Sequence, residues 1–166
     1  MEQIDEQPAA DDPPDNPSSL HNKVFRLAKE IGRLPTGPNA QLRRGEITGE
    51  FWIMLSKIGE ANSHLASLER WHTLAQCIAL AGQDSTDLGA ALRQAGLSDA
   101  RMTRLLEAQQ DALPSMFLRI ARRMRSQNVS ADWTRAFTLM ATDTKKPRYR
   151  VARAYYLPDS DQSNAK

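Results

Sequence analysis

The sequence lacks the residues and segments on which secreted and membrane proteins depend. It has one cysteine, Cys77, so no internal disulfide can form, and this predicts a reducing environment. No apolar run approaches the ~20 residues that a membrane-spanning helix needs. The N-terminus is acidic and rich in proline, unlike a signal peptide. These absences predict a soluble cytoplasmic protein with no membrane partner.

Catalytic and metal-binding motifs are also absent. The three histidines lie in separate contexts without metal-ligand spacing, and the chain has no HExxH motif, cysteine cluster, Walker loop or GxSxG motif. Carboxylates are few and scattered in the last third of the chain, whereas a metal-dependent nuclease gathers them around its ions. The sequence therefore predicts a protein that is not an enzyme, with no metal, no cofactor and no small-molecule substrate.

What the chain does have is an uneven distribution of charge. Residues 101–153 hold 12 basic residues, ten of them arginine, and four acidic ones, whereas the whole chain has a net charge of only +2. Residues 1–19 hold six acids and no base, which hides the charge of the body. The body, residues 20–157, has 21 basic and 12 acidic residues and a net charge of +9. Such a body is typical of proteins that bind a polyanion.

Apolar spacing predicts an all-α protein with about eight helices, because apolar residues recur at helical spacing and no segment alternates as a strand does. The candidate helices cover 20–34, 39–44, 48–58, 63–80, 86–95, 99–110, 114–126, 131–142 and 147–157. One bundle, or two over 20–84 and 85–157, would accommodate them, with a division near 82–86 or 96–98. The flanking segments, 1–19 and 158–166, are expected to be a disordered acidic tail and a flexible tail.

Particular residues predict where helices begin and end and which side chains face inward. Gly96 is suited to a left-handed turn. The stretch PTGP at 35–38 is expected to end the first helix. The expected inward residues of segment 48–58 are Phe51, Trp52, Leu55 and Ile58, and Leu65 is expected to face inward in the next helix. The expected N-caps are Ser18 or Ser19, Asp84 and Ser85, Ser98, and Ser130.

The helix over 114–126 separates an apolar face from an arginine face. At ~100° per residue, the apolar face is an arc formed by Leu113, Phe117, Ile120, Ala121 and Met124. Arg119, Arg122 and Arg123 form a similar arc almost opposite to it, with Arg125 at the border. No acidic residue occurs between Asp111 and Asp132, so pairing within the helix cannot neutralise these arginines. A solvated basic face is the ordinary interpretation of such a helix. Unpaired arginines, whose planar forks donate two hydrogen bonds to phosphate, favour a nucleic-acid site.

Three further groups of basic residues are candidates for the same site. The segment 145–153 contributes Lys145, Lys146, Arg148, Arg150 and Arg153. Its Tyr149, and Tyr155 and Tyr156 after it, could stack on bases. Tyr155 and Tyr156 are better explained as core residues.

The other two groups are pairs. Arg43 and Arg44 form a smaller basic spot that could bind nucleic acid or a partner protein. Arg101 and Arg104 share a helix face and either bind nucleic acid or pair with Asp99 or Glu107.

Four segments of the chain resemble elements of the CasB family, the small subunit of type I-E CRISPR surveillance complexes (Cascade). They occur in the family's order: GPNAQLRRG at 37–45, DLGAALRQAGLSDARMTRLLEA at 87–108, Asp-Trp at 132–133 and ARAYY at 152–156. The long acidic N-terminal segment is not part of that pattern.

The resemblance implies a non-catalytic helical protein of a ribonucleoprotein complex in antiviral defence. In such a complex two copies lie head to tail against the crRNA-bearing backbone subunits and the large subunit. The small subunits would help to hold target DNA, as the displaced strand, the target strand or both, when it opens into an R-loop. Guide pairing would supply the sequence specificity, and the basic surface would contact only nucleic-acid backbone.

Two other interpretations stay open from the sequence. The first is a helix-turn-helix transcription regulator, with 86–95 as the first helix, AGLS as the turn and 98–108 as the reading helix. Against it, the residues that would reach bases are Asp99, Ala100 and Met102, and the position four before the turn glycine is Leu92. The second is a helical scaffold whose basic face binds an acidic protein.

Overall fold

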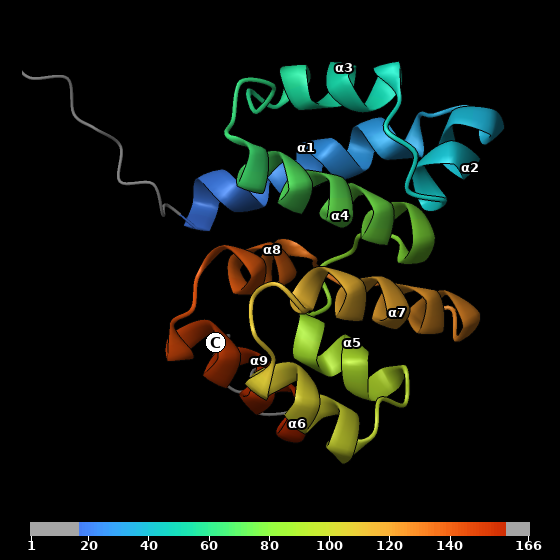
Figure 1. The fold of residues 1–166 in the computed structure, drawn as a ribbon. Helices are drawn as coiled ribbons and strands as arrows, with labels where there is room; N and C mark the ends of the chain where they lie inside the picture. Colours follow the sequence, from blue (N-terminus) through green and yellow to red (C-terminus); the bar gives the residue numbers. More distant parts are fainter. Residues whose placement is uncertain (1–16, 159–166) are drawn as a thin grey trace, which may run out of the picture.

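A computed structural model describes residues 17–158, and this part of the chain folds into nine α-helices without a strand (Figure 1). The predicted all-α class is confirmed. The helices are α1 (Pro17–Gly32), α2 (Thr36–Arg43), α3 (Gly49–Lys57), α4 (Leu65–Ala81), α5 (Leu88–Gln94), α6 (Asp99–Glu107), α7 (Leu113–Ser126), α8 (Thr134–Ala141) and α9 (Lys145–Tyr156).

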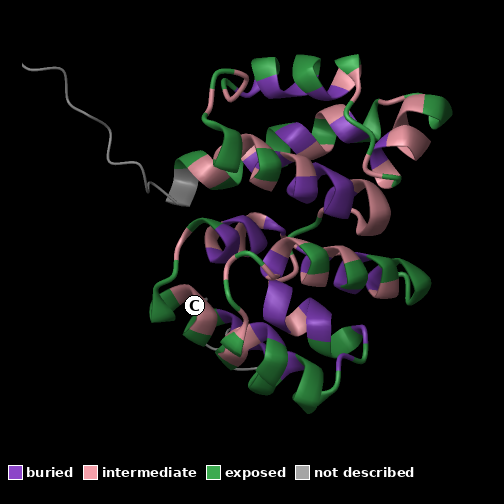
Figure 2. Cartoon of the chain, viewed as in Figure 1, coloured by how far each residue is buried: buried purple, intermediate pink, exposed green. Residues whose placement is uncertain are grey.

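The helices are arranged as two groups that pack against each other. Helices α1–α4 lie in the upper half of Figure 1 and α5–α9 in the lower half, and α4 packs against α7 and α8 across the boundary. Buried side chains form one continuous core through both groups, seen as purple inner faces in Figure 2. The division into bundles over 20–84 and 85–157 stays a prediction. The two predicted tails lie outside the described residues, except that residues 17–19 begin α1 and Pro158 follows α9.

Several predicted helix boundaries were wrong because proline and serine take other positions. The PTGP stretch begins α2 instead of only ending α1: Pro35 is its N-cap and Pro38 lies in the first turn, where a missing N–H breaks no helical hydrogen bond. Ser18 and Ser19 lie inside α1, which begins at Pro17. Ser130 Oγ donates to the carbonyl of Ala81 at 2.8 Å, and α8 begins only at Thr134.

The start of α5 and the turn before α6 show one wrong cap and two confirmed features. Asp87, and not Asp84 or Ser85, caps α5 by accepting from the Gly89 N–H. Ser98 caps α6 by accepting from the Arg101 N–H, as predicted. Gly96 has φ +73°, which confirms the predicted left-handed turn.

Most predicted inward residues are buried, and the exceptions have a geometric reason. Phe51 and Leu55 of α3 and its C-cap residue Ile58 are buried, but Trp52 is 42% exposed. The buried stripe continues through Met54 at i+3, and Trp52 lies about 100° away from Phe51 on the helix. Leu65 is the first residue of α4, where no neighbouring helix covers it, and it is 71% exposed.

Helix α5 lies against α9 at a contact that only glycine permits. A Cβ atom placed on Gly89 would lie 2.3 Å from the Val151 carbonyl oxygen and 2.7 Å from the Tyr155 backbone nitrogen. It would also lie 2.8 Å from the Cβ atom of Ala154. The Leu-Gly of the second family-like segment therefore sets the separation of α5 and α9.

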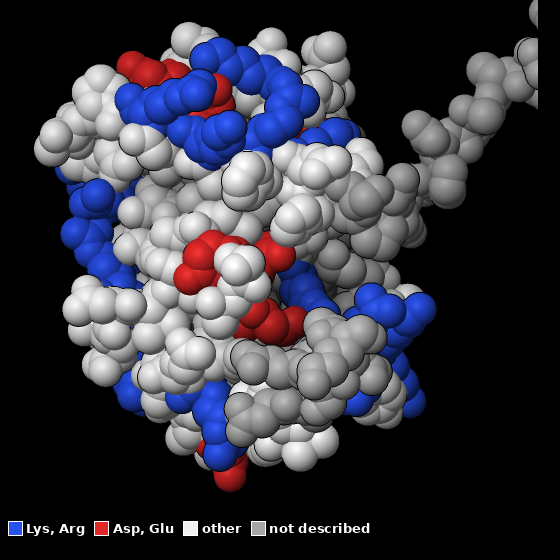
Figure 3. All heavy atoms as spheres, turned by 180° about the vertical axis from the view of Figure 1, so that it is seen from behind, with Lys and Arg blue, Asp and Glu red and all other residues white. Residues whose placement is uncertain are grey.

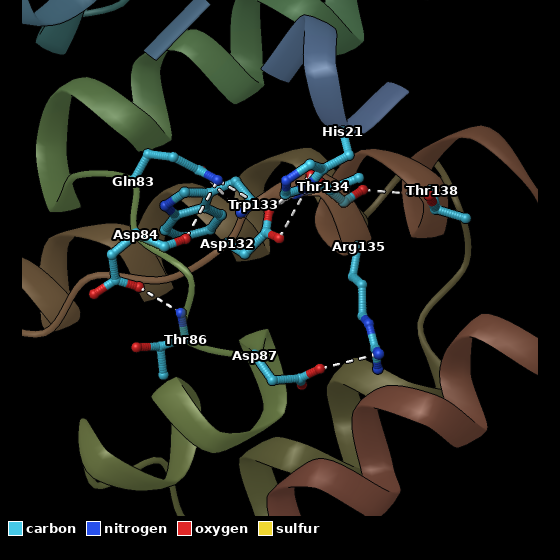
Figure 4. A network of polar contacts seen from close by, with 10 residues as sticks. All are labelled: His21, Gln83, Asp84, Thr86, Asp87, Asp132, Trp133, Thr134, Arg135 and Thr138. Atoms are coloured by element: carbon cyan, nitrogen blue, oxygen red, sulfur yellow. Dashed lines mark hydrogen bonds and ion pairs between the residues drawn. The ribbon is translucent and has the colours of Figure 1, made fainter. Parts of the chain in front are cut away.

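The Asp-Trp element connects the two helix groups through a network of polar contacts (Figure 4). Asp132 Oδ1 accepts hydrogen bonds from the Gln83 side chain at 2.9 Å and from the Thr134 N–H and hydroxyl at 3.0 and 2.7 Å. Asp132 Oδ2 lies 3.2 Å from Nδ1 of His21 in α1. The indole N–H of the fully buried Trp133 donates to the carbonyl of Gly82 at 2.9 Å. This element thus fixes α8 to the ends of α1 and α4.

Candidate nucleic-acid interface

Helix α7 presents three unpaired arginines on the side opposite the core. Its predicted apolar face is confirmed, because all five residues of that arc are buried: Leu113, Phe117, Ile120, Ala121 and Met124. Arg119, Arg122 and Arg125 are exposed, and none of their three side chains forms a hydrogen bond or ion pair with a described residue. Their guanidinium groups therefore keep all their donors available for an anion.

Arg123, the fourth predicted arginine of α7, is engaged in the fold. Its Nε donates to the carbonyl of Ala95 at 2.9 Å and its Nη2 to the carbonyl of Gly96 at 3.0 Å. These carbonyls end α5, where a helix leaves acceptors unsatisfied. The helical wheel could not separate Arg123 from its neighbours, because the α5–α6 turn that it contacts is distant in sequence.

Helix α9 repeats this division between free and engaged cations. Four exposed cations have side chains that form no hydrogen bond or ion pair with a described residue: Lys145, Lys146, Arg150 and Arg153. Arg148, in contrast, donates to the carbonyl of Leu106 at 2.7 Å and lies 3.6 Å from Asp143, with its side chain only 14% exposed.

The tyrosines of α9 face in different directions. Tyr149 is 68% exposed among the free cations, where its ring is available for stacking. Tyr155 is buried, as predicted for a core residue, and its hydroxyl donates to the Leu97 carbonyl in the α5–α6 turn and to Asp99 at the start of α6. The same prediction is wrong for Tyr156, which is 44% exposed.

Two engaged arginines connect α6 and the turn before it to α7 and α9. Arg123 of α7 binds the turn just before α6, and Arg148 of α9 binds the last turn of α6 at Leu106. Arg101 and Arg104 are exposed on α6, and the alternative of ion pairs with Asp99 or Glu107 is not realised among the described residues. Asp99 instead accepts a hydrogen bond from the Tyr155 hydroxyl at 3.1 Å.

Nine exposed cations of three helices in the lower group thus have no side-chain partner within residues 17–158. We call them the lower basic surface: Arg101, Arg104, Arg119, Arg122, Arg125, Lys145, Lys146, Arg150 and Arg153.

The predicted pair in α2 lies in the other helix group and is largely engaged. Arg43 Nε donates to the carbonyl of Ala79 at 3.2 Å, and the Arg43 carbonyl accepts from the Gln76 side chain at 2.9 Å. Arg44 forms an ion pair with Glu46 at 3.0 Å. These contacts hold α2 against α4, and the structure does not bring the pair together with the lower basic surface.

A second basic cluster, missed by the sequence analysis, lies where α1 meets α3. Figure 3 shows Lys and Arg side chains gathered near the top of the rear face, over these two helices. They surround a hollow of about 260 Å³, called here the α1–α3 hollow, which is lined by Arg26, Lys29, Glu30, Arg33, Lys57 and Ile58. The spacing of Arg26, Lys29 and Arg33 at i, i+3 and i+7 was the available signal. Lys57 could not be added to it without the tertiary structure.

Glu30 is the single carboxylate among the described residues that line this hollow. Its oxygens accept from Lys57 at 2.8 Å and from Arg33 at 3.2 Å. The hydrogen bond from Lys57, only partly opposed by desolvation, lowers the pKa of Glu30 below its ordinary value. Four cations and one ionised carboxylate leave the hollow with a clear positive surplus.

The described residues offer little that resembles an active site. Within residues 17–158, no group of three or more His, Cys, Asp or Glu side chains is placed to hold a metal ion. No helix in that range is long and apolar enough to cross a bilayer. Cys77 is buried in α4, as predicted for a packed residue, and burial raises the pKa of its thiol far above the usual range.

The fold and surface together define an all-α protein whose exposed arginines and lysines lie mainly on its C-terminal helices. The chain belongs to the Cse2 family of CRISPR-associated proteins, whose family model matches residues 39–156. This is the family that the four sequence segments resemble, so the resemblance to the Cascade small subunit is confirmed. Family membership gives the chain a role as a structural subunit of Cascade in CRISPR defence, associated with other Cascade subunits and with itself. Comparisons with curated proteins and with solved structures gave no match.

Proposed function

We propose that the chain is a non-catalytic Cascade subunit that binds nucleic-acid backbone, without sequence preference, through the lower basic surface. The observation that supports this most directly is the set of nine exposed cations without an acidic partner among the described residues. They are carried by helices whose other faces are buried in the core, so each cation is presented on a rigid support. Helices α7 and α9, which carry seven of the nine, contain no acid, whereas a generic solvated face would ordinarily hold acids of the same helix among its bases.

The proposed mechanism is electrostatic stabilisation of the R-loop. Exchange of a DNA duplex for an RNA–DNA duplex of similar stability is nearly balanced, so contacts worth a few kcal/mol can tip it. Each phosphate that the protein neutralises on a single strand contributes about −0.7 to the slope of log affinity against log salt. Five such contacts would give a slope of about −3.5, and all nine would give about −6.

The proposed partners follow from the family role. They are target DNA, the crRNA-bearing backbone subunits, the large subunit and a second copy of the chain. Four residues of the predicted site are assigned to the fold and not to primary phosphate contacts, because backbone carbonyls or carboxylates already occupy donors of their guanidinium groups. These residues are Arg43, Arg44, Arg123 and Arg148.

A helix-turn-helix regulator is a weaker proposal on this structure. Its first helix, α5, has only seven residues. In the would-be reading helix, Met102 is completely buried and the Asp99 carboxylate is bound by Tyr155. Neither side chain is free to reach base edges in a groove.

Matched charge removals test the proposal. The double variant Arg119→Gln/Arg122→Gln should bind single-stranded DNA more weakly. Its slope of log affinity against log salt should be less negative by about 1.4, as expected for two lost phosphate contacts. A control, Arg44→Gln/Arg70→Gln, removes the same charge from the upper helix group and should change the slope much less. Fluorescence anisotropy of a labelled oligonucleotide at several salt concentrations measures both. If both double variants changed the affinity and the slope equally, net charge alone would explain DNA binding and the lower basic surface would not be a specific site.

Arg123→Gln provides a second control, because Arg123 is in α7 but engaged in the fold. It should lower the free energy of unfolding and leave the salt slope unchanged. Preference for one defined duplex would support the regulator instead, and absence of any nucleic-acid binding would support a scaffold that binds an acidic protein.

A further inference from the structure

We propose that the acidic segment 1–16 of this chain binds back onto the α1–α3 hollow of the same molecule. The segment holds six acids and no base and lies outside the described residues. Both the segment and the α1 side of the hollow precede residue 39, where the match to the Cse2 family begins. This interaction is separate from nucleic-acid binding by the lower basic surface, and either can be true without the other.

The cations of the hollow have hydrogen-bond donors that no described residue occupies. Arg26 Nη2 donates to the Lys57 carbonyl at 2.7 Å, which fixes the guanidinium beside the end of α3. Glu30 engages one nitrogen each of Lys57 and Arg33. An ammonium group has three donors and a guanidinium five, so most donors of the hollow remain free for further carboxylates. Lys29 forms no hydrogen bond or ion pair with a described residue and only lies over the Phe25 ring, at 5.9 Å.

The length of the segment matches the position of the hollow. A helix rises ~1.5 Å per residue, so Arg26 and Lys29 lie about 14 and 18 Å along α1 from Pro17, and Arg33, directly after the helix, lies about 24 Å from it. An extended chain covers ~3.3 Å per residue, so the carboxylate of Asp11 can reach about 20 Å from Pro17 and that of Glu2 about 50 Å. A segment that turns back at the start of α1 can therefore place its acids beside all three cations.

The alternative path, across α8 towards the lower basic surface, meets a negative charge. His21, near the start of α1, lies beside the Asp132 carboxylate of α8. Hydrogen bonds from Thr134 and Gln83 outweigh the desolvation of Asp132 and keep its pKa below the ordinary value, so this carboxylate is ionised at neutral pH. It repels an acidic segment that starts nearby. Binding to α1 also closes a shorter loop, which costs less entropy.

Carbodiimide coupling of the full chain tests the proposal, because it forms an amide bond between a carboxylate and a lysine amine that are in contact. The chain has six lysines: Lys23, Lys29, Lys57, Lys145, Lys146 and Lys166. Peptide mass spectrometry should find acids of segment 1–16 joined to Lys29 and Lys57, with a yield that falls as salt screens the contact. The Lys23–Glu60 and Lys57–Glu30 contacts, at 2.6 and 2.8 Å, provide internal positive controls. Joining mainly to Lys145 and Lys146, or equally to all lysines, would overturn the proposal.

Two variants separate this hollow from general attraction to a basic protein. Arg33→Gln removes a cation of the hollow but no reactive lysine, and it should lower the yield at Lys29 and Lys57 several-fold. Arg150→Gln removes the same charge from α9 and should leave that yield unchanged. Equal effects of the two variants would reject a specific site.

The same coupling experiment distinguishes segment 1–16 from other molecules that could bind in the hollow. In a mixture of heavy-isotope and ordinary protein, products that join the two forms would show that the segment binds a second copy, which overturns the intramolecular arrangement. Protection of Lys29 and Lys57 from acetylation by added single-stranded DNA, with no joining to segment 1–16, would make the hollow a nucleic-acid site instead. None of these readouts depends on whether α7 binds DNA.

Discussion

Replacing Gly89 with alanine should separate α5 from α9 and destabilise the protein. The new Cβ atom would lie 2.3 Å from the Val151 carbonyl oxygen, about 1 Å closer than an ordinary C···O contact. Because the two shortest contacts are with backbone atoms, no side-chain rotation can relieve them. Helix α9, which carries four of the nine free cations, must retreat from α5 or bend.

The size of the effect follows from two opposing contributions. Overpacking of a core costs ~1–3 kcal/mol, and the backbone contacts place this site at or above the upper end of that range. Alanine recovers up to ~1 kcal/mol of helix propensity relative to glycine. We expect a net loss of about 2–3 kcal/mol in the free energy of unfolding, or about 4–12 °C in Tm for a chain of this size.

Thermal and urea unfolding followed by circular dichroism measures this loss. Gly37→Ala is the matched control, because a Cβ atom on Gly37, in α2, would meet no other atom within 4 Å. The control should be neutral or more stable by up to ~1 kcal/mol. If Gly89→Ala and the control agree to within ~0.5 kcal/mol, the close approach of α5 and α9 is not a rigid feature and this reasoning fails.

Two further predictions concern titratable groups. A pKa of Asp132 that is lower in the folded state stabilises the fold above the unfolded-state value of about 3.9, and this stability is lost as pH falls through the folded value. Asp132→Asn should therefore lower the urea midpoint at pH 7, and its difference from the parent should shrink below pH 4; a constant difference would contradict this. Cys77 should react with thiol reagents at pH 8 only at a rate set by unfolding, because it is buried and its pKa is raised. Rapid labelling of the folded chain would contradict its packing.

The chain's local patterns were sufficient to predict its class and much of its detail. The 3.6-residue spacing predicted helices and the buried face of α7, because both depend on neighbours three and four positions apart. Gly96 and Ser98 were also predictable, since a left-handed turn and a helix cap are decided within a few residues. The order of short motifs was enough to indicate the family that residues 39–156 match.

The tertiary structure alone decided which cations are free. Arg122 and Arg123 are adjacent in α7, have the same side chain and charge, and both lie outside the apolar face of the helix. Arg123 is engaged because the α5–α6 turn, 27 residues away in sequence, presents its carbonyls there, whereas Arg122 faces solvent. The α1–α3 hollow arises in the same way, since Lys57 joins the α1 cations only when α3 packs on α1. The periodicity of apolar residues predicts which face of a helix is buried in the core. The contacts of the opposite face depend on segments that are distant in the sequence, so periodicity cannot predict them.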